Sequence, residues 1–305
     1  MIKSFKKLKS YIEKERFAGY DPYDALNSPV LRGMSFGNKY LRIAFTQGLK
    51  RLPFNLRPFL LMRKGHNPKG LGLFLWGYAK LYKTEKNPEY LVQIEKFLNL
   101  LDSCKTEVRL DTGLCRNDKG SYRHDSGAGH GWGYNFDWQS RAFFVPKYTP
   151  TVVNSSFVGH TLLDTFAFTN LTRAKDLALP IGTFITQSLN RLNEDGTVCF
   201  SYTPIDHYFV HNANLLGASL LIRLYKETDN QEYKITALAA LAYAMKHQRP
   251  DGSWFYAEKD IAHWIDSFHT GFNLQAIRYF LDLGFAEEYR AQYEKGVRFY
   301  TDNFF

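Results

Sequence analysis

Apolar and polar positions alternate along the chain in a pattern that recurs four times. A short polar connection ends at Tyr90, Leu177, Tyr233 and Tyr289, and these residues are 87, 56 and 56 positions apart. An apolar segment rich in small residues precedes each connection, and an amphipathic segment follows it. A helix that is apolar on nearly every side is buried, whereas one with a polar stripe lies outside. The pattern therefore predicts stacked pairs of an inner and an outer helix.

The boundaries of the expected helices follow from the repeat. Inner helices are expected over 70–81, 152–168, 212–224 and 268–280. Outer helices are expected over 89–101, 174–192, 232–247 and 287–300. Two further helices are expected near the start of the chain, over 2–17 and 39–62. We therefore expect an all-α fold, an α/α toroid of about five to six helical hairpins, with residues 1–305 as a single domain.

Two kinds of connection interrupt the helices. Asp195-Gly196 and Asp251-Gly252 are tight-turn dipeptides followed by aromatic or β-branched residues, which predicts a short β-hairpin at each. Residues 104–150 account for the longer first spacing of the repeat. This segment is rich in glycine, histidine and aromatic residues and poor in helical periodicity, so we expect a loop inserted into the ring.

The positive charge is concentrated in the first part of the chain. The whole sequence carries a net charge of +9, but residues 1–83 hold 17 Lys and Arg against 4 Asp and Glu. The basic helices of residues 1–65 either form a solvated face or contact anionic lipid head groups or a polyanionic chain. Residues 49–64 mix cations with bulky apolar side chains, as peripheral membrane anchors do. Nucleic acid is not an expected partner, because the chain contains no recognised binding module.

The sequence also suggests where the protein resides. Residues 1–16 are charged throughout, unlike a signal peptide, and no run of about 18 uncharged apolar residues occurs. The cysteines, Cys104, Cys115 and Cys199, are odd in number and lack the pairing of a zinc site. We therefore expect reduced thiols and a cytoplasmic protein, located at the inner face of the membrane if the basic segment docks there.

Residues able to carry chemistry gather in four places that flank the inner helices. These places are 122–141, 154–156, 206–214 and 264–273. In a ring, the starts of the inner helices meet at one end of the central cavity, so we expect these side chains to converge there. Simpler explanations stay open for each place: a self-packed aromatic loop, a helix cap or a structural histidine.

Three roles compete for the histidines. His207 and His211 are four residues apart and would share one face of a helix as zinc ligands, but the sequence fixes no third ligand. The second role is purely structural. In the third, His211 and His269 exchange protons with a substrate near neutral pH. The chain has no G-x-S-x-G, phosphate-loop or dinucleotide motif, which argues against serine hydrolases, ATPases and NAD enzymes, so no cofactor is expected. No metal is expected either, because the third ligand is missing from the sequence pattern.

Specific residues follow from the acid–base interpretation. His211 and His269 are the proposed acid–base groups, and the carboxylates expected to orient them or act as acids are Asp137, Asp206 and Asp266. The groups expected to hold an anionic sugar are Arg141, Asn154 and Asn212. The other candidates for substrate binding are aromatic or imidazole side chains: His130, Trp132, Tyr134, Trp138, His207, Trp254 and Trp264. Aromatic faces suit sugar rings, but they suit prenyl chains as well.

Two sets of motifs resemble known families. Residues 248–254, QRPDGSW, are similar to the Q-x-x-x-G-x-W repeat of prenyltransferases and squalene–hopene cyclases, which implies a toroid. Residues 20–28 (YDPYDALNS), 66–70 (HNPKG), 131–139 (GWGYNFDWQ) and 150–154 (PTVVN) resemble the VpsJ-like proteins of bacterial capsule, O-antigen and exopolysaccharide gene clusters. This resemblance implies an α/α toroid with a part in surface-polysaccharide synthesis, and it supplies no catalytic residues.

The expected toroid is also similar in architecture to glucuronyl C5-epimerases, polysaccharide lyases and six-hairpin glycosidases. The first two remove the C5 proton of a uronate with a histidine or tyrosine base, whereas glycosidases use two carboxylic acids. We therefore expect a carbohydrate-active protein that modifies a glycan or a lipid-linked glycan by epimerase- or lyase-type chemistry. Two alternatives remain: a glycan-binding or scaffold protein without catalysis, and a prenyl- or terpenoid-processing enzyme.

Overall fold

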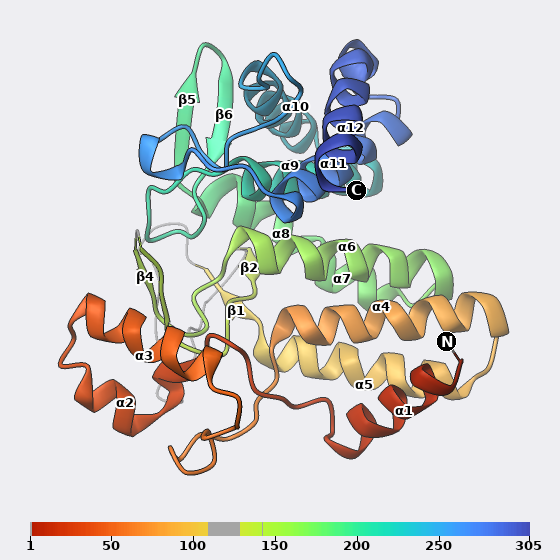
Figure 1. The fold of residues 1–305 in the computed structure, drawn as a ribbon. Helices are drawn as coiled ribbons and strands as arrows, with labels where there is room; N and C mark the ends of the chain where they lie inside the picture. The colour runs from red at the N-terminus through yellow and green to blue at the C-terminus, as the bar shows by residue number, and fades with distance from the viewer. Residues whose placement is uncertain (1, 109–128, 142) are drawn as a thin grey trace.

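A computed structural model describes residues 2–108, 129–141 and 143–305. Four inner helices pack side by side, α4 against α6, α6 against α9 and α9 against α11 (Figure 1). The inner helices are α4 (Pro68–Glu85), α6 (Val152–Thr169), α9 (His211–Thr228) and α11 (Ser267–Asp282). Their outer partners are α5 (Glu89–Cys104), α7 (Thr172–Ala178), α10 (Gln231–Lys246) and α12 (Arg290–Phe304). The α/α toroid expected from the repeat is confirmed.

Local sequence explains where the inner helices begin and how closely they pack. Asn67 and Asp266 cap α4 and α11 with their side chains, and Pro68 occupies a first-turn position where its missing N–H costs nothing. Gly159 lets α6 approach α9, because a Cβ there would lie 2.5 Å from Cδ2 of Leu220. Small residues on buried helices therefore set the spacing of the ring.

Proline ends two helices earlier than the apolar pattern predicts. The outer helix expected over 174–192 is divided: α7 ends at Ala178, and α8 (Pro180–Thr183) and a π-helical turn (Phe184–Ser188) follow. Pro180 lacks the N–H that would continue α7. The helix expected over 39–62 is α3 (Lys39–Arg51), with Pro53 close behind its end.

One of the two expected β-hairpins is present. Strands β5 (Arg191–Glu194) and β6 (Thr197–Phe200) pair in antiparallel register around Asp195-Gly196, where both residues have positive φ. At Asp251-Gly252 the chain turns without forming strands, which corrects the second expectation. The residues beyond that turn pack inward instead of pairing, because Trp254 is buried in the core.

The inserted segment 104–150 consists of loops pinned by short strands in its described part. β1 (Thr106–Glu107) pairs with β2 (His130–Gly131), and β3 (Trp138–Gln139) pairs with β4 (Phe144–Val145). Residues 109–128, which include Cys115 and the start of the glycine- and histidine-rich run, lie outside the described residues.

A second, smaller hydrophobic cluster lies near the start of the chain. It consists of Ala25, Leu49 and Met62, with Tyr20, Leu31, Leu56 and Leu60 packed around them. We call residues 20–62 the N-terminal lobe; it contains the 3-10 turn η1 (Asp24–Asn27), α2 (Pro29–Met34) and α3, at the lower left of Figure 1. α1 (Ile2–Lys14) precedes the lobe and lies at the lower right. Among the described residues, none of the helices has the length and apolarity to span a membrane.

Candidate functional site

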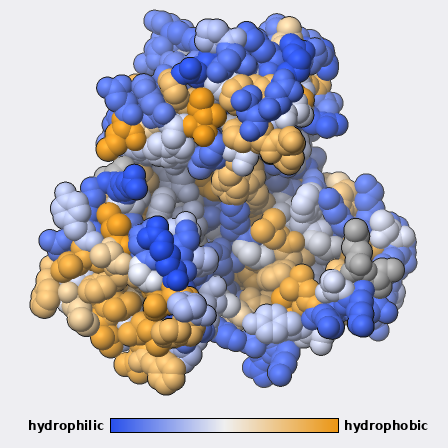
Figure 2. Space-filling model, in the orientation of Figure 1, coloured by the Kyte–Doolittle hydropathy of each residue, from blue (hydrophilic) through white to orange (hydrophobic). Residues whose placement is uncertain are grey.

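A cavity of about 560 Å³ opens where the inner helices begin, and we call it the central cavity. Figure 2 shows this face of the molecule hollowed at its centre, between the N-terminal lobe and the C-terminal hairpins. The lining comes from the first two turns of α4, α6, α9 and α11, the loops that precede α9 and α11, the inserted segment and the start of the lobe. The lining side chains are Asp21, Pro22, Tyr23, Asn67, Lys69, Tyr134, Phe136, Trp138, Val153, Phe157, Tyr202, Asn212, Leu216, Tyr256, Trp264, Phe268, His269 and Phe272.

Aromatic rings form much of the wall of the central cavity. Tyr256 stacks on Trp264 with ring centroids 4.5 Å apart, and the hydroxyls of Tyr134 and Tyr202 are joined by a 2.9 Å hydrogen bond. Trp138 packs edge-on against Tyr134 at 5.6 Å. These contacts fix flat apolar faces beside polar hydroxyl groups, which is a surface suited to a ring with both apolar and hydroxyl-bearing sides.

His269 is the titratable side chain best placed for proton transfer in this cavity. Asp266 caps α11 by accepting a hydrogen bond from the His269 backbone N–H, and its other oxygen lies 2.6 Å from His269 Nδ1. Burial raises the pKa of Asp266, but the hydrogen bonds from His269 outweigh it and leave that pKa below its usual value. In the described residues Nε2 of His269 forms no hydrogen bond, so it is available to a ligand.

The start of the lobe and the first turn of α4 contribute an acid and a base to the cavity lining. Asn67 Nδ2 donates to Asp21 Oδ2 at 3.1 Å, and Lys69 Nζ lies 3.9 Å from the centroid of the Phe157 ring. Burial raises the pKa of Asp21 and lowers the pKa of Lys69. Burial therefore disfavours the charged form of each group.

Sequence reasoning did not name Asp21, Asn67 or Lys69 as site residues. They fall in the 20–28 and 66–70 segments that carry the VpsJ-like resemblance, so that resemblance was the available signal.

Six of the expected site residues are brought together. Tyr134, Trp138, Asn212, Trp264 and His269 line the central cavity, and Asp266 supports His269. The Asn212 amide is well placed for a ligand: its Oδ1 is buried and has no hydrogen-bond partner in the described residues. Because burying an unpaired amide is costly, this atom is a candidate contact for a bound molecule.

His211 lies outside the central cavity, although it begins α9 as the repeat suggested. Its Nε2 donates to Glu258 Oε1 at 2.6 Å, and its ring packs against Tyr243 of α10. Consecutive side chains on a helix point in different directions, so Asn212 faces the cavity while His211 faces α10. Burial lowers the pKa of His211 despite Glu258. The expectation that His130, His211 and His269 share one hollow is therefore not met.

Three other candidates are core residues. His130 Nε2 donates to the Leu177 carbonyl at 2.9 Å, and burial lowers the pKa of His130 to about 4. The indole N–H groups of Trp132 and Trp254 donate to the carbonyls of Leu101 and Ala244, each at 2.8 Å. With only 0% and 2% of their surfaces exposed, the two tryptophans cannot stack on a ligand.

Two of the proposed carboxylates hold loops instead of lining the cavity. Asp206 accepts hydrogen bonds from the backbone N–H groups of Tyr202, Thr203 and Tyr208. Asp137 accepts one from Lys147 N–H at 2.8 Å. The pair of facing acids that a glycosidase needs is therefore not formed by Asp137, Asp206 and Asp266.

The remaining candidates are dispersed. Arg141 and His207 are exposed in loops, and Asn154 is fully buried in α6; none of the three lines the central cavity. α9 begins only at His211, so His207 and His211 do not share a helical face. Across residues 2–108, 129–141 and 143–305, His, Cys, Asp and Glu side chains form no group of three that could hold a metal ion.

A partly buried polar network links the four inner helices. Arg223 of α9 lies 2.5 Å from Asp164 of α6, which also accepts a hydrogen bond from the Trp76 indole of α4 at 2.8 Å. Arg223 also donates to Nδ1 of His160, and Tyr279 of α11 stacks on that imidazole at 4.6 Å. Burial and the nearby Arg223 keep the pKa of His160 well below its usual value. Nothing in the sequence pattern singled out this network.

Solved structures share the architecture of this chain. A D-mannose isomerase is 16% identical, with a TM-score of 0.54, covering 92% of this chain and 74% of that one. The cellobiose 2-epimerase of Spirochaeta thermophila is 10% identical, with a TM-score of 0.56, covering 93% and 76%. A polysaccharide lyase is 12% identical, with a TM-score of 0.52, covering 96% and 80%. These likenesses show the fold. No family model and no curated protein matches the sequence.

Proposed function

We propose that the protein is a carbohydrate-active enzyme that binds one sugar unit of a glycan in the central cavity. His269 removes a proton from that sugar. The observation that carries the proposal is the His269–Asp266 pair, set in an aromatic wall with Nε2 open to the cavity. The sugar isomerase, epimerase and lyase among the structural neighbours support the same class of substrate.

The geometry suits removal of a proton from a carbon next to a carbonyl or carboxylate. The Asp266 carboxylate accepts the Nδ1–H hydrogen bond, which leaves Nε2 of His269 as the base. The proton moves from carbon to Nε2, and the electron pair becomes an enolate. Lys69 lies on the cavity wall, where its ammonium group can stabilise that negative charge, and Asn212 Oδ1 can accept a hydrogen bond from a sugar hydroxyl.

Two outcomes follow from the same intermediate. Return of a proton to the opposite face of the carbon gives epimerisation, whereas loss of the β-oxygen substituent gives lyase-type elimination. Tyr256, whose ring lies 4.6 Å from that of His269, can donate a proton in either case, because burial raises its pKa and keeps the hydroxyl protonated. The polar groups Asp21, Asn67 and Lys69 fit a sugar better than a prenyl chain.

The resemblance to VpsJ-like proteins supports a bacterial surface polysaccharide, or its lipid-linked precursor, as the glycan. Deleting the gene and analysing the surface polysaccharide by mass spectrometry and NMR would identify the altered sugar. Wild-type protein should restore that sugar, and His269→Gln should restore it about 10²- to 10⁴-fold more slowly. His207→Gln is the matched control, because this exposed histidine lies outside the cavity.

The experiment also separates catalysis from binding. If His269→Gln restores the polysaccharide fully while Trp264→Ala does not, the protein is a glycan-binding component and the enzymatic proposal fails.

A further inference from the structure

We propose that the N-terminal lobe docks on an anionic lipid bilayer, inserting aromatic and aliphatic side chains of α2, α3 and the following loop while its cations contact lipid head groups. The proposal stands independently of the sugar chemistry, because it uses a different surface.

The first observation is the exposure of large apolar side chains on the lobe. Phe36 is 88% exposed, Phe59 81% and Tyr40 76%, and Leu61 and Phe54 are exposed by 68% and 60%. Figure 2 shows an apolar patch at the lower left, the side on which Figure 1 places α2 and α3. Scattered exposed apolar residues are ordinary, but a contiguous patch marks a surface that another body covers.

The lobe directs its largest side chains away from its own core. That core consists of Ala25, Leu49 and Met62, while phenylalanines stand on the outside. Phe36 and Leu61 are highly exposed and lie at turns with positive φ, 46° and 57°. L-residues rarely adopt this conformation, so these two turns are unusual places for bulky apolar side chains that remain exposed.

The charge of the lobe determines which partner fits. Residues 20–62 contain six Lys and Arg against two acidic residues, and one of those, Asp24, is paired with Arg57. Arg32, Lys39 and Arg51 are exposed and form no ion pair within the described part of the chain. Bulky apolar side chains interspersed with cations of one sign match the interface of an anionic bilayer, where apolar tips enter the acyl boundary and ammonium or guanidinium groups stay at the phosphates.

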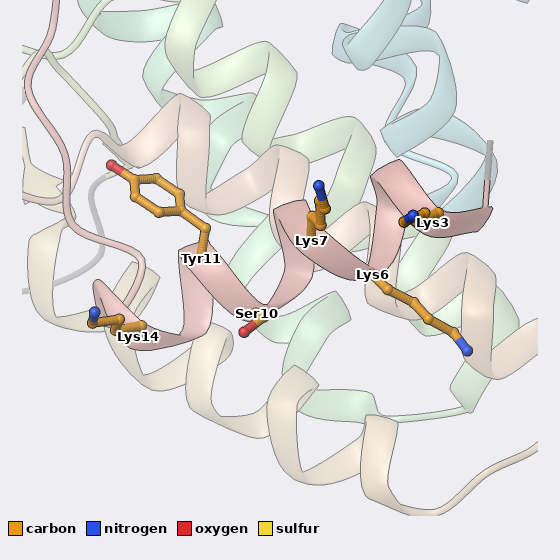
Figure 3. Close-up of a pocket in the computed structure, with 6 residues that line it drawn as sticks. All are labelled: Lys3, Lys6, Lys7, Ser10, Tyr11 and Lys14. Carbon is orange, nitrogen blue, oxygen red and sulfur yellow. The ribbon is translucent and has the colours of Figure 1, made fainter.

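The first helix extends the positive surface. Figure 3 shows a shallow depression of about 780 Å³ along α1, lined by Lys3, Lys6, Lys7, Ser10, Tyr11 and Lys14. α1 lies on the same lower side of the molecule as the lobe in Figure 1. Each lysine near an anionic surface adds attraction that falls away within a Debye length, so α1 strengthens docking at low salt.

Cosedimentation of the full chain with lipid vesicles tests the proposal. Wild-type protein should bind vesicles of phosphatidylcholine and phosphatidylglycerol at least about tenfold more tightly than vesicles of phosphatidylcholine alone, and high salt should weaken the binding. The double variant Phe36→Ser/Phe59→Ser should lose about tenfold or more in affinity. Lys39→Glu/Arg51→Glu should lose about tenfold and most of the salt dependence.

Ile235→Ser/Ile261→Ser is the matched control, because these side chains are 67% and 78% exposed elsewhere on the molecule. It should bind vesicles as the wild type does, and circular dichroism should show all variants folded. Equal binding to both vesicle types, no binding, or unchanged binding of the phenylalanine variant would overturn the proposal. Sedimentation without vesicles tests whether the patch is instead a protein interface. That would be the result if the wild type is a dimer, Phe36→Ser/Phe59→Ser is a monomer and neither binds vesicles.

Discussion

The toroid and the N-terminal lobe treat the same kinds of residue in opposite ways. Phe97 of α5 is fully buried in the toroid, whereas Phe59 of the lobe is 81% exposed. Charges differ in the same sense: Asp164 and Arg223 pair inside the toroid, while Arg32 and Lys39 of the lobe have no acidic partner in the described residues. The toroid packs and pairs these residues internally, whereas the lobe leaves Phe59, Arg32 and Lys39 exposed to solvent, although it pairs Arg57 with Asp24.

The largest expected effect comes from truncating one phenylalanine in each region. Phe97→Ala should lower the free energy of unfolding by about 3–5 kcal/mol, because it leaves a cavity in a packed core. Phe59→Ala should change it by less than about 0.5 kcal/mol, since its ring touches mostly solvent. Urea unfolding measures both. If Phe59→Ala lowers the free energy of unfolding as much as Phe97→Ala does, the lobe buries its aromatic rings in solution. The contrast between a packed toroid and an exposed lobe would then be wrong.

The second test concerns acid, because the toroid buries neutral histidines and residues 20–62 contain none. Folding lowers the pKa of His130 to about 4, while the unfolded chain takes up that proton near 6.5. The neutral side chain therefore favours the folded state above pH 6.5, and this contribution disappears as the pH falls to about 4. The loss is about 2–3 kcal/mol for His130, and His160 and His211 act in the same direction.

His130→Gln isolates one share of this effect, because glutamine can still donate to the Leu177 carbonyl. The slope of unfolding free energy against pH should become shallower between pH 6.5 and 4 by up to about one proton. Buried carboxyls with a raised pKa, such as Asp206, make the folded state relatively more stable as the pH falls toward 4, which opposes the effect of His130. The upper half of the pH range therefore reports on His130 more clearly. An unchanged slope would show that His130 is not buried in solution.

The smallest expected effect comes from a substitution that should change sugar turnover in the cavity and leave vesicle binding by the lobe unchanged. Asp266→Asn keeps an oxygen to cap α11 but removes the negative charge beside His269. Turnover should fall about tenfold with little change in KM, because the imidazolium formed during proton transfer loses its stabilising partner. Vesicle binding should stay unchanged. A parallel loss of both properties would indicate that cavity and lobe act as one unit.

Period and composition were enough to predict the toroid. The inner helices begin within two residues of the expected positions, because each copy of the repeat carries its own apolar run and turn. Helix ends were harder to predict where proline intervened, as at Pro180.

Side-chain direction is what the sequence could not supply. His211 and Asn212 are neighbours, yet only Asn212 reaches the cavity, because a helix separates adjacent side chains in angle. Asp21 and Lys69 reach the cavity only because the fold brings distant segments together. The spacing of these residues in the sequence does not indicate that they share a site. Trp132 and Trp254 looked like stacking residues by composition, but they fill the core.

The central cavity is not built by the ring alone, since Asp21, Pro22 and Tyr23 of the lobe complete its rim. If the lobe docks on a bilayer, the opening of the central cavity therefore lies close to the lipid–water boundary. A sugar tethered to a lipid carrier could then reach His269 by diffusing in two dimensions, while a free sugar would have to arrive from bulk water.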